Sequence, residues 1–97
     1  MTENDLKKYR AKIDKIDKTI AECFEKRMQI VGEISKFKIE KGIATYDASR
    51  EQKMKQKNIA YINDVALRKY YLDILDELLK VSKQFQEELK KNQKSGN

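Results

Sequence analysis

Residues 5–40 read DLKKYRAKIDKIDKTIAECFEKRMQIVGEISKFKIE and contain no proline. At about 100° per residue, the apolar side chains of one helical face fall within roughly 80° of one another: they are Leu6, Tyr9, Ile13, Ile16, Ile20, Val31 and Ile34. Nothing interrupts this pattern before Gly42, so we predict one helix of roughly 36 residues, about 54 Å long. That length is about twice the diameter of a compact domain of this size. We therefore expect the apolar stripe to project beyond its own domain and to pack on a second copy of the chain.

The whole chain has 97 residues, with Lys+Arg 22 against Asp+Glu 16 and a net charge of +6. Hydrophobic and charged residues each make up 39%, whereas an average soluble domain is about 45–50% apolar and about 25% charged. Leu, Ile, Val and Phe are 23 of the 97 residues, which is above the roughly 20% below which a charged chain is usually disordered. We expect a single folded domain over residues 1–97 whose small core favours association with a partner.

Counts of single residue types exclude several classes of protein. One cysteine, Cys23, and no histidine exclude a disulfide framework, a Cys/His zinc site, a Ser-His-Asp triad and a Cys-His dyad. The glycines form no phosphate-binding loop, so the P-loop and dinucleotide fingerprints are missing. The sequence has no signal-peptide core and no run of 18 apolar residues. We expect a cytoplasmic protein without a metal, a cofactor or a membrane span.

Two further helices are expected after residues 41–46. Gly42 is a helix C-terminal signal and Asp47 is a suitable N-cap, so a short helix should run from about 48 to 58. A third helix, capped by Asn63-Asp64, should run from about 65 to 90, and the tail from about residue 91 should fray. One face of the third helix is apolar and carries Leu67, Tyr71, Ile74, Leu78, Phe85 and Leu89. The predicted fold class is all-α, with a long, a short and a long helix.

Cations lie where the first helix should be apolar. With Ile20 at 0°, Arg27 falls at about −20° and Lys38 at about 0°. A buried charge is costly without a partner, so each cation needs an anion from this chain, a second chain or a ligand. Arg10 flanks the same stripe at about +80°, where a second subunit is expected to meet it. A polar layer in a coiled coil, or a side chain whose charged end reaches solvent, explains one such cation but less readily two.

Neutral and acidic groups complete the set of candidate site residues. Ser82 lies about 40° from Leu78 within the apolar face, and Gln86 follows one turn later, so the two form a hydrogen-bonding patch. Asp47 and Glu51 are explained by helix capping and the helix dipole, but Arg50 is a cation poorly placed for that dipole. Cations, carboxylates and neutral hydrogen-bonding groups without a metal-ligand cluster favour the binding of a small polyanion.

The ordered set of these residues resembles the all-helical chorismate mutase family. It comprises Arg10-x-x-Ile13-Asp14-x-Ile16-Asp17, Arg27, Lys38, Gly42, Asp47-x-x-Arg50-Glu51, Ser82 and Gln86, and extends from Leu6 to about Leu89. The resemblance implies an intertwined homodimer with two active sites, each built mainly by one chain and completed by the first helix of the other. It also implies the Claisen rearrangement of chorismate to prephenate in phenylalanine and tyrosine biosynthesis, a pericyclic step that needs no cofactor or metal.

The resemblance assigns the carboxylates of chorismate to basic residues. Arg27 of one chain and Arg10 of the partner subunit are expected to hold the two carboxylates, assisted by Ser82 and Arg50. Binding both groups would fold the substrate into its reactive conformer, so that binding energy is used for orientation.

The resemblance assigns the remaining polar groups of chorismate to four other residues. Lys38 and Gln86 are expected to donate hydrogen bonds to the ether oxygen, which gains negative charge as the C–O bond breaks. The carboxylate of Glu51, with the backbone near Asp47, is expected to fix the substrate hydroxyl.

Three other functions stay open at this stage. An isochorismate pyruvate lyase shares this fold and nearly the same site, although the D-x-x-R-E segment and the linker length favour the mutase. A nucleic-acid binder is compatible with the net charge of +6, but the cations are mixed with acids and form no stripe. A non-catalytic helical dimerisation module would use Arg27 and Lys38 to set its register. Docking onto another enzyme of aromatic biosynthesis is also compatible with the sequence.

Overall fold

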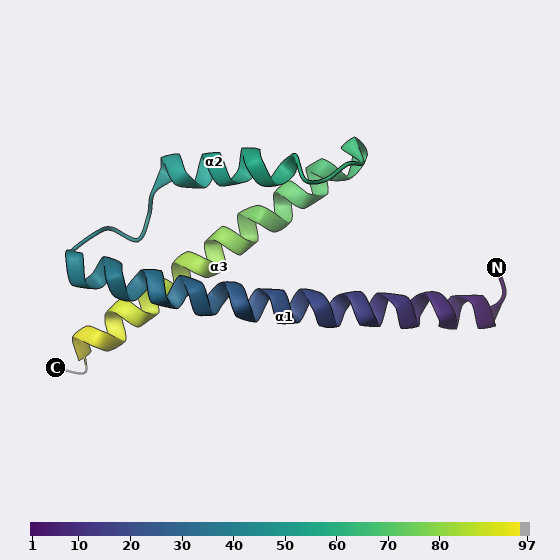
Figure 1. Ribbon diagram of the computed structural model, residues 1–97, viewed down its shortest axis with the longest axis horizontal. Coiled ribbons are helices and arrows are strands. Elements are labelled where there is room, and N and C mark those ends of the chain that lie inside the picture. Colours follow the sequence, from purple (N-terminus) through teal and green to yellow (C-terminus); the bar gives the residue numbers. More distant parts are fainter. Residues whose placement is uncertain (96–97) are drawn as a thin grey trace. The chain divides into compact units, whose positions relative to one another are not determined.

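The computed structural model describes residues 1–95, which form helices and no strand (Figure 1). The elements in chain order are α1 (Glu3–Lys41), α2 (Ala48–Ile59), the 3-10 helix η1 (Val65–Leu67) and α3 (Arg68–Ser95). The predicted all-α class and the long, short, long order of helices are confirmed. The chain divides into two compact units, Met1–Ile30 and Val31–Asn97. Most of α1 belongs to the first unit, and its last turns belong to the second with the other elements.

The first unit is a helix without a covered face. Thr2 and Asp5 start it with a capping box: the Thr2 N–H donates to Asp5 Oδ2 at 2.9 Å, and the Asp5 N–H donates to Thr2 Oγ1 at 3.2 Å. The backbone hydrogen bond from Thr2, aided by the Thr2 side chain, lowers the pKa of Asp5. No residue of this unit is buried, and the residues on the side of the helix that carries Ile16 and Ile20 are exposed. The predicted apolar stripe is therefore present but uncovered within the chain.

A glycine turn ends α1. Gly42 has a φ of 67°; its N–H donates to the Ile39 carbonyl at 3.3 Å, and the Ile43 N–H donates to the Lys38 carbonyl at 2.8 Å. These two bonds are those of a Schellman motif, in which a residue without a Cβ adopts the left-handed backbone conformation at little cost. The helix consequently stops at Lys41, one residue before the glycine and one residue after the predicted end at about Glu40.

Helix α2 begins where the cap predicts and ends one residue later than expected. The Asp47 carboxylate accepts a hydrogen bond from the Arg50 N–H at 3.0 Å, which satisfies one of the otherwise unpaired N–H groups of the first turn. None of the α2 residues is buried. Two ion pairs join α2 to α3, from Lys55 to Asp76 at 3.2 Å and from Glu51 to Lys83 at 3.4 Å.

The third helical segment differs from the prediction at both ends. Its first three residues form η1, capped by Asp64, whose carboxylate accepts from the Ala66 N–H at 3.0 Å. At the other end α3 continues to Ser95, although the sequence predicts an end at about Lys90. Residues 91–95 contain no glycine or proline, so nothing in them stops the helix. The remainder of the tail, residues 96–97, lies outside the described residues.

Burial along α3 identifies the face that the second unit covers. Leu75 is fully buried, and Ser82 and Gln86 are 5% and 9% exposed, whereas Ile74 is 60% exposed. At about 100° per residue, the buried residues centre about 60° from Leu78, so the apolar stripe predicted around Leu78 is covered on one side only. Leu67 and Ile74 belong to the uncovered side, so the predicted apolar face is only partly covered within the single chain.

Candidate active site

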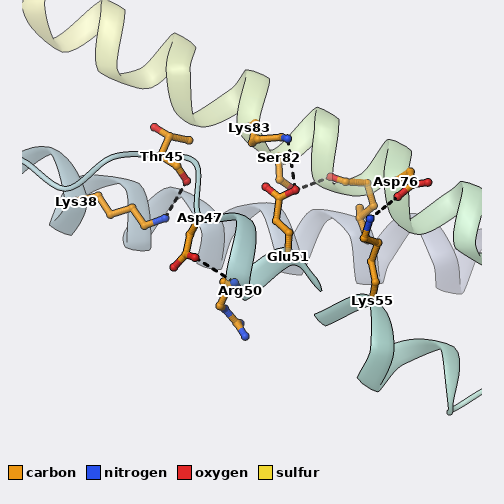
Figure 2. Close-up of polar contacts among 10 residues, drawn as sticks. Lys38, Thr45, Asp47, Arg50, Glu51, Lys55, Asp76, Ser82 and Lys83 are labelled. Atoms are coloured by element: carbon orange, nitrogen blue, oxygen red, sulfur yellow. Dashed lines mark hydrogen bonds and ion pairs between the residues drawn. The ribbon is translucent and has the colours of Figure 1, made fainter. Parts of the chain in front are cut away.

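Lys38 lies in the last turn of α1 and is half-buried. Its Nζ donates a hydrogen bond to the Thr45 carbonyl oxygen at 3.2 Å (Figure 2). The turn at Gly42 makes this bond possible, because it brings the following segment back to the helix that has just ended. The partner of Lys38 within the chain is thus a neutral carbonyl and not the expected anion. An ammonium group carries three N–H donors, so Lys38 can hold the Thr45 carbonyl and still donate to a ligand.

The first turn of α2 presents two carboxylates with different tasks. Asp47 uses its side chain to cap the helix. Glu51 is one turn further on, its side chain is 19% exposed, and it points toward α3, where it pairs with Lys83 (Figure 2). Arg50 is exposed, and its guanidinium group points away from α3 in the same view. Of these residues, Glu51 is the one directed into the packed region between α2 and α3.

Among the residues of α3 whose burial is described, Ser82 and Gln86 are the buried polar side chains. The Ser82 hydroxyl donates to the Leu78 carbonyl at 2.8 Å, a bond to the preceding turn that serine often makes within helices. Gln86 Oε1 is buried and has no hydrogen-bond partner. Leaving such an atom unpaired costs about 1–3 kcal/mol. Turning the amide by 180° exchanges its oxygen and nitrogen, so this position can present either an acceptor or a donor to a bound molecule.

The structure adds residues that the sequence analysis missed. Lys83 Nζ lies 3.4 Å from Glu51 Oε1 and 4.7 Å from the centre of the Tyr46 ring. Lys83 follows Ser82 directly and precedes Gln86 by three residues, so it borders the same helical face. That spacing is the signal that could have identified it. Thr45, the partner of Lys38, left no such signal because it contributes only its backbone.

Six of the eight candidate residues belong to the second unit, and a series of contacts connects their elements. Lys38 at the end of α1 contacts the segment that leads into α2; the first turn of α2 contacts α3 through Glu51 and Lys83. Ser82 and Gln86 lie on α3 on either side of Lys83. Arg10, which is exposed, and Arg27, which is half-buried, belong to the first unit, and their part in a site stays a prediction.

The chemistry of this arrangement is that of anion binding and hydrogen-bond donation. Its charged groups are ammonium, guanidinium and carboxylate, and its buried groups are a hydroxyl and an amide. Within residues 1–95, no group of three His, Cys, Asp or Glu side chains is placed to hold a metal ion. Among the same residues, no helix combines the length and the apolar character that crossing a membrane requires.

Comparison with known families agrees with this chemistry. A family model described as "Chorismate mutase type II" matches residues 9–87, about four-fifths of the chain, and this range includes every candidate residue from Arg10 to Gln86. The search of curated proteins and the search of solved structures found no match. The extent of the family match shows that this chain belongs to the chorismate mutase type II family, whose reaction is the rearrangement of chorismate to prephenate.

Proposed function

We propose that this protein is an isomerase that converts chorismate to prephenate as an intertwined homodimer. The observation that carries the proposal is the buried, unpaired side-chain oxygen of Gln86, on the same face of α3 as Ser82, in a chain whose family catalyses this reaction. An unpaired buried oxygen is costly. Turning the amide by 180° puts its N–H in that place, and a substrate oxygen that accepts this N–H removes the cost.

Lys38 and Gln86 act on the ether oxygen of chorismate. In the rearrangement the ether C–O bond breaks while a new C–C bond forms, and negative charge develops on the oxygen. Donors aimed at that oxygen stabilise the transition state more than the substrate, and one such donor changes kcat by about 10²–10³ in other enzymes. The bond from Lys38 to the Thr45 carbonyl supports this role because it restricts where the ammonium group can lie.

The carboxylates of chorismate bind to Arg27 and to Arg10 of the partner subunit, with Ser82 and Arg50 assisting. Holding both carboxylates selects the compact conformer in which the reacting carbons are close. The contribution of Ser82 requires its hydroxyl to turn from the Leu78 carbonyl to the substrate. The contribution of Arg50 requires its exposed side chain to fold toward the ligand.

Glu51 accepts a hydrogen bond from the substrate hydroxyl, together with the backbone near Asp47. The low exposure of the Glu51 side chain and its direction toward α3 support this assignment. A carboxylate fits the task because an ionised carboxyl group only accepts hydrogen bonds, and a hydroxyl can donate one.

The uncovered apolar face of α1 supports the homodimer. Ile13, Ile16 and Ile20 are 54%, 58% and 60% exposed in the single chain, and they lie on one side of the helix with Tyr9 and Leu6. Monomeric proteins rarely expose a contiguous apolar patch of this extent. A second copy offers a matching apolar stripe, as an isologous dimer requires.

The first test is the loss of chorismate absorbance with purified protein, with the product identified by chromatography. Formation of prephenate is the expected result. Release of pyruvate from isochorismate without prephenate formation would support the lyase instead. A stable dimer that leaves both substrates unchanged would contradict catalysis and favour a dimerisation module.

A further inference from the structure

Lys83 is held by two partners from other segments of the second unit. Its ammonium group pairs with Glu51 of α2 at 3.4 Å and lies over the ring of Tyr46, in the segment before α2, at 4.7 Å from the ring centre. Figure 2 shows Lys83 on α3 directly above the Glu51 side chain. A lysine in solvent has several freely rotating bonds, whereas a cation held over an aromatic face beside a carboxylate has a restricted position.

The second ion pair between α2 and α3 provides a comparison. Lys55 and Asp76 are 3.2 Å apart, so this pair joins the same two helices at a similar distance. Asp76 is 52% exposed, however, and Glu51 only 19%, whereas Lys55 at 23% is less exposed than Lys83 at 36%. Exposed pairs contribute little, and neither Lys55 nor Asp76 is a candidate site residue. The Lys83–Glu51 pair, by contrast, includes a residue expected to touch the substrate.

The contact between Lys83 and the Glu51 carboxylate indicates what Lys83 does. Lys83 contacts Oε1 of Glu51, and a carboxylate has a second oxygen that can accept further hydrogen bonds. A carboxylate held through one oxygen presents the other in a defined direction.

We propose that Lys83 is a positioning residue that holds Glu51 through Oε1, so that the other oxygen of Glu51 receives the hydroxyl group of chorismate. Tyr46 in turn holds Lys83. This proposal rests on the proposed function, because it requires chorismate to bind with its hydroxyl at Glu51. In this proposal Lys83 contributes to recognition of the substrate hydroxyl through Glu51. It has no role at the ether oxygen, which other residues contact.

The test compares chorismate with its deoxy analogue, in which hydrogen replaces the hydroxyl group. Lys83→Met removes the charge and keeps most of the apolar stem, and Lys83→Arg keeps a cation that can both pair with a carboxylate and lie on a ring. Lys55→Met is the matched control, since it breaks the other α2–α3 ion pair. Each variant is also made with Glu51→Gln, and kcat and KM are measured for both substrates with the dimeric protein.

We expect Lys83→Met to lower kcat/KM for chorismate by about tenfold, mainly through KM, since a hydrogen bond to a charged group has roughly this weight. For the deoxy analogue the change should be less than about twofold, and Lys83→Arg should recover most of the loss. In the Glu51→Gln background, Lys83→Met should have no further effect on chorismate, because the group that Lys83 positions is already altered. Lys55→Met should keep the kcat/KM of the unaltered protein.

Two results would overturn the proposal while leaving the proposed function intact. One is an active protein in which Lys83→Met has no effect on chorismate. The other is an equal loss for chorismate and the deoxy analogue, which would mean that Lys83 acts on folding or on another part of the substrate. Failure of the unaltered protein to convert chorismate would overturn both proposals together.

Discussion

Residues 1–30 and residues 31–97 are both helical, but they differ in the burial of their side chains. The first region contains no buried residue, whereas the second contains Ser35, Leu75, Ser82 and Gln86, the buried residues among those described. Both regions have an apolar stripe with helical spacing. A stripe alone therefore does not create a core, because burial requires a second element of matching shape. In the second region α3 meets such an element, and for the first region a second copy of the chain is the proposed one.

Polar contacts differ in the same way. In residues 1–30 the pair of Lys18 and Glu22 is local, at 4.0 Å between exposed side chains one turn apart. In residues 31–97 the pairs of Lys55 with Asp76 and of Lys83 with Glu51 join different helices. Local pairs contribute about 0.2–0.5 kcal/mol to a helix and define no tertiary arrangement. The contacts of the second region determine which side chains meet at the candidate site.

The contrast between the two regions requires that the apolar stripe of residues 1–30 packs on a partner. Ile16→Lys tests this requirement, and we expect it to have the largest effect of the variants. A lysine at Ile16 would be buried in both copies of a dimer without an anion beside it. We expect dimerisation to weaken on the order of a thousandfold and chorismate turnover to fall with it. Sedimentation velocity and kcat/KM provide the measurements. Ala11→Lys, about 140° away from Ile16 around the same helix, is the control and should leave both unchanged. An active dimer of Ile16→Lys would contradict the assignment.

Lys38→Ala tests whether the second region carries the chemistry. Loss of one donor to the ether oxygen should lower kcat by about 10²–10³, with KM less affected and the dimer intact. Lys36→Ala is a suitable control, because Lys36 is 67% exposed and pairs only with Glu33 on its own helix. Comparable kcat values for the two variants would argue against Lys38 as a catalytic residue.

Arg10→Ala mixed with Lys38→Ala tests whether the first region serves the partner's site. In a mixed dimer one site keeps Lys38 and receives an intact Arg10 of the partner subunit, while the other site lacks both groups. Random exchange makes half of the dimers mixed, so the mixture should regain roughly a quarter of the activity of the unaltered protein. If Arg10 served its own chain, no complete site would form and the mixture would stay as inactive as its components.

Gly32→Ala should have the smallest effect of these variants. It tests how closely the start of the second region packs against Phe85. A Cβ at Gly32 would lie 3.7 Å from Phe85 Cε2, which is an ordinary contact. Alanine should therefore stabilise the helix by up to about 1 kcal/mol and raise Tm by about 4–8 °C, with kcat unchanged. Gly42→Ala is the contrasting variant, since the φ of 67° at Gly42 strains any residue with a Cβ, and its Tm should fall. A lower Tm for Gly32→Ala would show that Phe85 cannot accept the methyl group.

Much of the fold could be predicted because its signals are local. Gly42 and Asp47 set their boundaries through bonds to residues at most five positions away. The burial of Ser82 and Gln86 followed from polar residues at apolar positions of a helical stripe. Lys83 escaped prediction because a lysine at the edge of such a stripe is usually solvated. Its partners Glu51 and Tyr46 belong to another helix and to the segment before it, so no local pattern reveals them.

The sequence by itself determined the three helices, their caps, the membership in the chorismate mutase type II family and the polar residues within the apolar stripes. Each of these depends on spacing along one chain segment or on an ordered set of residues. Tertiary structure determined which side of α3 is covered, and hence that Leu75 is buried while Ile74 is exposed. It also determined the partners of Lys38 and Lys83. The predicted apolar face of this helix included Ile74 and omitted Leu75, because only contact with another element decides which side chain leaves water.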